Sequence, residues 1–138
     1  MGSVDTEPQR LLCWTVCAYR KPGMDEKEYH KYMSEVHAPL VKDLMVKYGM
    51  IQWSMTHNTS STKSLMAEIA GPQFNNFADY DCIVTAVFPD VQNFVRMKAD
   101  PFYKERVMPD HENFADTKRS RMSVGWIENH IMDGKAVD

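Results

Sequence analysis

Three histidines occupy positions from which an imidazole could move a proton: His37, His57 and His111. Imidazole titrates near neutral pH, which makes it the side chain most often used as a general acid or base. His37 follows Met33 by one turn on an apolar helical stripe and comes just before Pro39, so we expect it to face a helix–sheet interface rather than bulk solvent. A core histidine that binds the carbonyl left unpaired by Pro39 would explain this position equally well.

His57 and His111 are candidates for different reasons. His57 follows Trp53 and Met55 on one face of a predicted strand and stands where that strand opens into a long loop. Pocket mouths often form at such strand ends. An exposed turn histidine is an equally good interpretation of His57, and capping of a short segment after Pro109 is the corresponding alternative for His111.

Aromatic and acidic side chains could line a cavity beside these histidines, because phenol and indole groups offer hydrogen-bond donors to a polar aromatic ligand. Eleven methionines also suit an adaptable cavity for a flat hydrophobic molecule, although ordinary core filling is the better explanation for any one of them. The residues considered for the cavity are Trp14, Tyr19, Tyr29, Trp53, Asp81 and Trp126.

Neither a metal site nor a phosphate loop is predicted. The five histidines form no HExxH pair and share no short spacing with carboxylates and cysteines, and the six glycines are isolated. The three cysteines all fall in strand-like apolar segments, so no disulfide framework is expected.

The charge pattern excludes several classes of partner. A net charge of -3 and an isoelectric point near 5.9 provide no basic field for nucleic acid. No apolar run approaches the roughly 20 residues that cross a bilayer, and the first ten residues are polar where a signal peptide needs an apolar stretch. We therefore expect a cytoplasmic protein that binds neither nucleic acid nor membrane.

The first half of the chain predicts two strands around one long helix. Residues 11–19 form a continuous apolar run rich in β-formers, which is typical of a buried strand. An amphipathic helix begins after Asp25 as N-cap and ends at Gly49, with a kink or restart at Pro39. Residues 50–57 then predict a second strand.

The second half repeats this order in shorter pieces. Residues 58–80 lack sustained periodicity and predict a long loop, which could act as a lid. A strand over 81–88 is followed by short helices that begin near Asp90 and Asp100 and end at Pro109, and residues 120–130 supply the last strand.

The order β-α-β-β-α-β predicts an α+β, ferredoxin-like fold with a four-stranded antiparallel sheet. We assign one domain to residues 11–131 and polar, unstructured tails to 1–10 and 132–138. The first and third strands carry apolar residues on both faces, which predicts a partner sheet from a second copy and hence a homodimer.

Several segments resemble the EthD-domain family: MDEKEYHKYMSEVHAPLV, YGM, TH, DYDCIV, PDHENFAD and SVGWIE. More narrowly the chain is similar to the small fungal EthD-type decarboxylases of aromatic polyketide pathways, which act on precursors such as atrochrysone carboxylic acid. The resemblance implies a dimeric α+β barrel with a pocket between the helices and the sheet of each subunit. It also implies that His37 and His57 are pocket residues.

The activity implied by the resemblance is decarboxylation of an aromatic polyketide β-keto acid without a cofactor. His37 or His57 would hydrogen-bond the carbonyl that becomes an enolate, and the other, or His111, would return a proton to carbon. The ring would be positioned by a further set, Trp14, Tyr19, Tyr29, Trp53 and Asp81. Alternatives are a polyketide cyclase, dehydratase or pericyclase, a non-catalytic binder of hydrophobic aromatics, and a haem protein with a pocket histidine as axial ligand.

Overall fold

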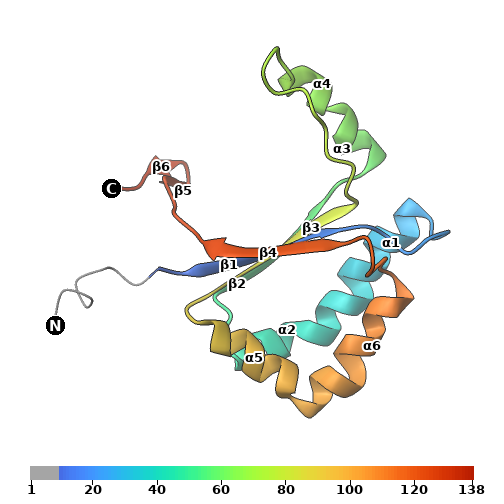
Figure 1. The fold of residues 1–138 in the computed structure, drawn as a ribbon, viewed down its shortest axis with the longest axis vertical. Coiled ribbons are helices and arrows are strands. Elements are labelled where there is room, and N and C mark those ends of the chain that lie inside the picture. Colours follow the sequence, from blue (N-terminus) through green and yellow to red (C-terminus); the bar gives the residue numbers. More distant parts are fainter. Residues whose placement is uncertain (1–9) are drawn as a thin grey trace.

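Four antiparallel strands form the central sheet of the computed structural model, which describes residues 10–138 (Figure 1). The predicted tail therefore lies outside the described residues except for Arg10. The strand order β2-β3-β1-β4 is that of a ferredoxin-like fold, and confirms the predicted α+β class. The strands are β1 (Leu12–Ala18), β2 (Gln52–His57), β3 (Cys82–Phe88) and β4 (Arg121–Trp126).

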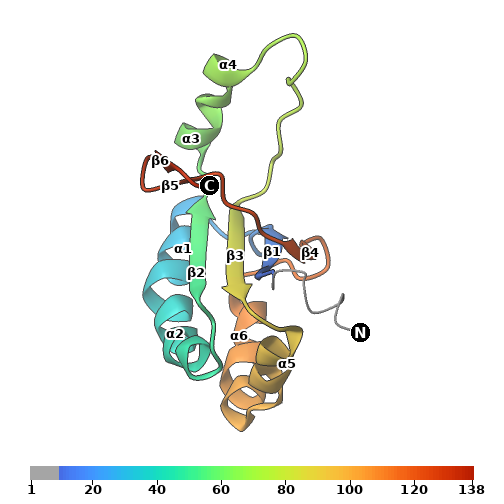
Figure 2. The same cartoon turned by 90° about the vertical axis from the view of Figure 1, so that its left-hand side faces the viewer.

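Two helical runs cover one face of this sheet (Figures 1 and 2). The first comprises α1 (Glu26–Tyr32), the π-helical segment η2 (Met33–His37) and α2 (Ala38–Lys47). The second comprises α5 (Val91–Ala99), the π-helical segment η3 (Tyr103–Val107), α6 (Met108–Asp110) and the 3-10 turn η4 (His111–Asn113). The hydrophobic core lies between these runs and the sheet.

Both runs begin at the caps that the sequence predicts. The side chain of Asp25 accepts hydrogen bonds from the backbone N–H groups of Lys27 and Glu28, as an N-cap should. Asp90 caps α5 by accepting from Gln92 N–H, and Asn93 completes a capping box.

The helix restarts beside Pro39, as predicted: α2 begins at Ala38, directly after the π-helical segment η2. The backbone N–H of Ala38 reaches back five residues to the carbonyl of Met33, so a π turn precedes the proline. A wider turn moves the preceding carbonyls away from the proline ring and absorbs the missing N–H, which lets helical geometry continue. His37 is the last residue of this π turn.

The predicted helix end at Pro109 is wrong, because a π turn precedes this proline too and helical geometry continues past it. Met108 N–H bonds the carbonyl of Tyr103, again five residues back, and helical geometry then continues through Asp110 into η4. Each helical run therefore contains one π turn directly before a proline. Such turns recur at functional sites because they re-aim side chains.

Residues 58–80, called the arm below, contain two short helices where the sequence predicts none. These are α3 (Ser60–Ser64) and α4 (Met66–Ile69). Thr59 and Thr62 form a capping box that starts α3, a local signal that outweighs the lack of hydrophobic periodicity. The arm projects away from the sheet (Figures 1 and 2).

The C-terminal segment forms a small hairpin instead of the predicted unstructured tail. Its strands are β5 (Ile131–Met132) and β6 (Lys135–Ala136). Asp133 and Gly134 join them with φ angles of +52° and +78°. Asp-Gly favours this two-residue turn because positive φ is least costly for these residue types.

The two faces of the sheet differ in what covers them. Both helical runs lie on one face, and on the other side only α3 and α4 of the arm rise among residues 10–138, at one end of the sheet (Figure 1). On that open face β3 presents Ile83 and Val87, whereas β2 presents Gln52, Ser54 and Thr56. The open face is therefore apolar only along its middle. No helix among the described residues is long and apolar enough to span a membrane.

Gly49 closes α2 in a conformation that a side chain would strain. Its φ is +84°, and a Cβ atom there would lie 2.7 Å from Nδ2 of Asn93, which donates to the Tyr48 carbonyl. We expect Gly49→Ala to lower the free energy of unfolding by about 1–3 kcal/mol in urea denaturation. Gly71 has open space around it, so Gly71→Ala is the control and should change stability by less than about 0.5 kcal/mol. Equal losses in both variants would contradict this account.

Candidate active site

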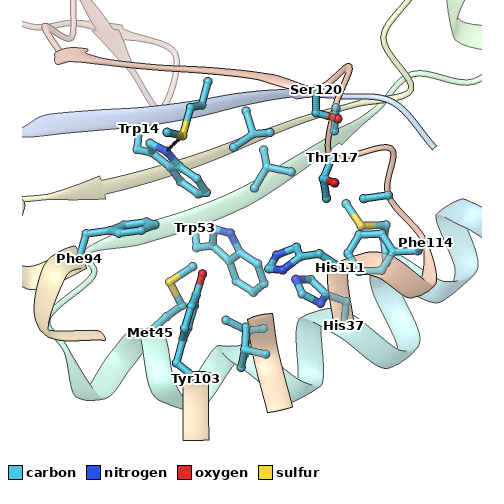
Figure 3. Close-up of a pocket in the computed structure, with 18 of the residues that line it drawn as sticks. Trp14, His37, Met45, Trp53, Phe94, Tyr103, His111, Phe114, Thr117 and Ser120 are labelled. Carbon is cyan, nitrogen blue, oxygen red and sulfur yellow. Dashed lines mark hydrogen bonds between the residues drawn. The ribbon is translucent and has the colours of Figure 1, made fainter. Parts of the chain in front are cut away.

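A cavity of about 260 Å³ lies between the sheet and the helical runs (Figure 3). Its walls are mostly apolar and aromatic, and both π turns contribute side chains to it. The lining residues used below are Trp14, His37, Trp53, Phe94, Tyr103, His111, Phe114 and Met122. A cleft of this composition, with a few convergent polar groups, is typical of a small-molecule site.

His37 is the most enclosed polar group in this wall, with 6% of its surface exposed. Its Nδ1 lies 2.8 Å from Oδ2 of Asp110. The other oxygen of Asp110 accepts hydrogen bonds from the Tyr32 hydroxyl and from Nδ2 of Asn113. Burial alone would raise the pKa of Asp110, but the three hydrogen bonds together hold the pKa of Asp110 below its ordinary value. Asp110 is therefore an anion at neutral pH.

An ionised Asp110 fixes the tautomer of His37. A carboxylate can only accept, so Nδ1 of His37 carries the proton and donates it to Asp110. Burial lowers the pKa of His37, opposed by the hydrogen bond to Asp110 and assisted by the nearby His111. His37 is therefore neutral at pH 7, and its Nε2 carries a lone pair that can accept a proton. The arrangement is that of a general base oriented by a carboxylate.

His111 lies beside His37, with the two ring centroids 4.9 Å apart (Figure 3). Its Nδ1 lies 3.1 Å from the carbonyl of Met108. Because a carbonyl only accepts, this nitrogen also carries a proton, and Nε2 is the free ring nitrogen of His111. Phe114 packs against both imidazoles and keeps this end of the cavity apolar.

Two donors line the cavity away from the imidazoles. The indole Nε1 of Trp53 is buried and has no hydrogen-bond partner among the described residues. A buried donor left without a partner costs on the order of 1–3 kcal/mol. Burial raises the pKa of Tyr103, so its hydroxyl stays protonated, and Figure 3 shows it directed from the helix layer toward the cavity.

The cavity brings together only part of the set considered from the sequence. His37, His111, Trp14 and Trp53 all line it. The indole N–H of Trp14 donates to the sulfur of Met122 at 3.4 Å, which joins β1 to β4 at the cavity wall.

His57 does not line this cavity, contrary to the expectation that it meets His37 there. It shares a strand face with Trp53, but four residues of extended chain separate the two by about 13 Å. Nδ1 of His57 instead lies 2.7 Å from Nδ1 of His30, and its Nε2 is 3.4 Å from the hydroxyl of Ser34. His57 therefore belongs to a contact between β2 and the first helical run.

Tyr19, Tyr29 and Asp81 also lie off the cavity. Tyr29 is fully buried in the core between α1 and the sheet, where its ring fills space. Asp81 accepts hydrogen bonds from the backbone and guanidinium of Arg20. The Tyr19 hydroxyl donates to Asp79 at the base of the arm. Tyr19 and Asp81 therefore have hydrogen-bond partners of their own, whereas the buried hydroxyl of Tyr29 has none among the described residues.

Sequence reasoning missed Asp110, Tyr32 and Tyr103. Asp110 stands 73 positions after His37, so no local spacing links them. The available signal was that HAPL and MPDH each place a polar residue within two positions of a proline in an apolar helical stripe. Among residues 10–138, no group of three or more histidine, cysteine or acidic side chains is arranged to hold a metal ion.

The fold and the cavity define a class: a ferredoxin-like α+β protein with a histidine–carboxylate pair in an apolar pocket. The model of the EthD domain matches residues 21–118, so the chain belongs to the EthD domain family. This confirms the resemblance found in the sequence.

The chain is similar to named fungal proteins over nearly its whole length. It is 53% identical to the decarboxylase claH of Passalora fulva over 129 residues, covering 94% of this chain and 84% of that one. It is 51% identical to the dehydratase aurZ of Gibberella zeae over 136 residues, covering 99% and 90%. Homologues of this kind support enzyme activity for the chain, with decarboxylases among them.

Among solved structures, a dimeric ferredoxin-like protein of unknown function from Bacteroides fragilis superposes with a TM-score of 0.57 at 8% identity. The match covers 85% of this chain and 96% of that one. Identity this low shows the fold alone.

Proposed function

We propose that the protein is a cofactor-independent decarboxylase of an aromatic polyketide carboxylic acid of the β-keto acid type, resembling atrochrysone carboxylic acid. The observation that carries the proposal is the neutral, buried His37 held by the ionised Asp110 at the wall of an apolar cavity. The relatives named decarboxylase support the choice of reaction.

His37 begins the reaction as the base. Its Nε2 accepts the carboxyl proton of the bound acid, and Asp110 stabilises the imidazolium that forms. The bond between the α-carbon and the carboxylate then breaks, CO2 leaves, and the electron pair moves through the α-carbon to the neighbouring carbonyl oxygen as an enolate. The imidazolium returns its proton to the α-carbon, so the only net loss is CO2.

The enolate oxygen needs a donor while its charge develops. The indole N–H of Trp53 is a fixed donor without a protein partner, and the Tyr103 hydroxyl is a second one. His111, beside His37, is placed to share in the proton return. The surrounding aromatic rings exclude water from the carboxylate, which favours loss of its charge as CO2.

Dehydration is the second candidate, because relatives at 51% and 50% identity are named dehydratases. His37 would then remove a proton from the carbon beside a carbonyl, and the imidazolium that forms would pass this proton to the departing hydroxyl, which leaves as water. Cyclase or pericyclase chemistry would leave the composition of the substrate unchanged or remove only water. A non-catalytic binder would stabilise the ligand complex without turnover.

We also propose that the protein acts as a cytoplasmic homodimer. The open face of the sheet supports this state, as does the dimeric fold of structural neighbours. Two copies packed through these faces would form a closed barrel with the helices outside.

Product masses test the proposed reaction. Purified protein is incubated with an aromatic polyketide β-keto acid, and both the product mass and released CO2 are measured. We expect a product lighter by one CO2, in a yield that matches the gas. A product that keeps its carboxyl group but lacks one water would replace decarboxylation by dehydration. If the ligand raises the thermal midpoint but no new product forms, the protein binds the polyketide without catalysing a reaction.

A further inference from the structure

The arm carries large apolar side chains that are exposed to solvent in a single subunit. Leu65, Ile69, Phe74 and Phe77 are all more than half exposed, and Phe74 reaches 84%. Monomeric proteins rarely present such a group of apolar side chains without a partner for it.

The base of the arm is fixed, so the arm is not positioned to fold back over its own cavity. Glu26 in α1 accepts hydrogen bonds from the backbone N–H and hydroxyl of Ser60. On the returning segment, Asp79 accepts from Tyr19, and its carbonyl accepts from Lys63. Both ends of the arm are therefore tied to the domain or to each other.

The arm rises on the open side of the sheet, opposite the helices (Figure 1). The hairpin of β5 and β6 rises on the same side at the other end of the sheet (Figure 1). The open face of the sheet therefore lies between the arm at one end and the β5–β6 hairpin at the other. A second copy of the chain packed on this open face would contact the arm directly.

A second apolar surface lies along β4. Met122, Val124 and Trp126 point to the helix side of the sheet but are 74%, 58% and 50% exposed, because β4 is an edge strand. Met122 also lines the cavity, so the cavity wall at this edge faces solvent. The enclosed volume of about 260 Å³ is below the roughly 300–1,000 Å³ usual for ligand sites.

We propose that the arm of each subunit covers β4 of its partner and completes the wall of the partner's cavity. The proposal rests on the homodimer proposed above. A two-fold axis parallel to the strands places each β2 edge opposite the partner's β4 edge. His57, where the arm leaves β2, lies at the same end of the sheet as Arg121, where β4 begins.

The size of this contact is adequate for a stable dimer. Each aromatic side chain buries about 150–250 Å². Phe74 and Phe77 of the arm, packed against Met122 at the end of β4 nearest the arm and counted twice by symmetry, bury about 600–1,000 Å². The facing sheets add to this area, so the contact reaches the roughly 1,000 Å² of a specific interface.

A photo-cross-link tests the contact independently of any activity. Benzoylphenylalanine replaces Phe74 in dimers mixed from isotopically heavy and light subunits, and the adducts are mapped by mass spectrometry after irradiation. We expect adducts between a heavy and a light chain on the peptide that contains Met122 to Trp126. Adducts confined to one chain, or a protein that elutes as a monomer, would overturn the proposal.

Subunit complementation tests the completed cavity. One subunit carries His37→Ala with an intact arm, and the other carries Phe74→Asp and Phe77→Asp with an intact His37. Each homodimer should be nearly inactive, whereas the heterodimer should recover about half of the wild-type rate, because one of its two cavities is whole. No recovery would mean that each arm serves its own subunit.

Asn75→Asp with Asn76→Asp adds the same charge to the arm without removing apolar area, and this control should retain activity. Should the protein fail to release CO2 at all, the proposed reaction falls, but the cross-link still decides the position of the arm.

Discussion

Replacing His37 with asparagine is expected to lower kcat for CO2 release by about 10²–10⁴-fold. The amide N–H of asparagine can still donate to Asp110, which keeps the buried carboxylate paired, but it offers no basic nitrogen in place of Nε2. The loss should therefore appear in kcat with little change in the thermal midpoint or in binding of the product.

His57→Ala is the matched control for this variant. His57 contacts His30 and Ser34 and does not line the cavity, so we expect its removal to leave kcat within about threefold of wild type. The His37 assignment fails if both variants turn over at the wild-type rate. A large loss of kcat in His57→Ala alone would instead indicate that the reaction takes place at the His57 end of β2.

Replacing Asp110 with asparagine is the second change with a large expected effect. A neutral amide can donate as well as accept, so it no longer holds the Nδ1–H tautomer of His37, and the imidazolium formed in the reaction loses its counter-ion. We expect kcat to fall by about 10²-fold or more.

The pH profile separates this role from a merely structural one. His37 acts as a base, so activity is present above its pKa and is lost as pH falls through that pKa, which burial places below the ordinary 6.5. Because the Asp110 carboxylate raises the pKa of His37, Asp110→Asn should lower that pKa further. The acid limb of kcat/KM should therefore move to lower pH. If Asp110→Asn lowers the maximum of kcat/KM but leaves the acid limb at the same pH, the pairing of Asp110 with His37 is contradicted.

Asp100→Asn is the control for loss of a buried carboxylate. Asp100 is as buried as Asp110 and accepts hydrogen bonds from Tyr48 and Lys47, but it lies away from the cavity. Its replacement should lower stability while leaving the acid limb in place. If Asp100→Asn shifts the acid limb of kcat/KM as much as Asp110→Asn does, the limb reports unfolding of the whole protein and not the titration of His37.

Local signals predicted most of the elements but not the form that the helical runs take beside their prolines. The apolar run of β1 and the caps at Asp25 and Asp90 act within a few residues, so their predictions held. The restart expected at Pro39 occurs at Ala38, but it takes the form of a π turn, which single-residue propensity does not encode.

The sequence by itself determined the α+β class, the strand order and the burial of His37, because alternation and helical spacing fix which face of each element turns inward. Only the tertiary structure decided which groups surround that imidazole. Asp110 reaches His37 from the other helical run, and His57, on the expected face, lies too far along β2. Periodicity specifies which face of its element a side chain points from. Which residues that side chain meets depends on where along their lengths two elements cross.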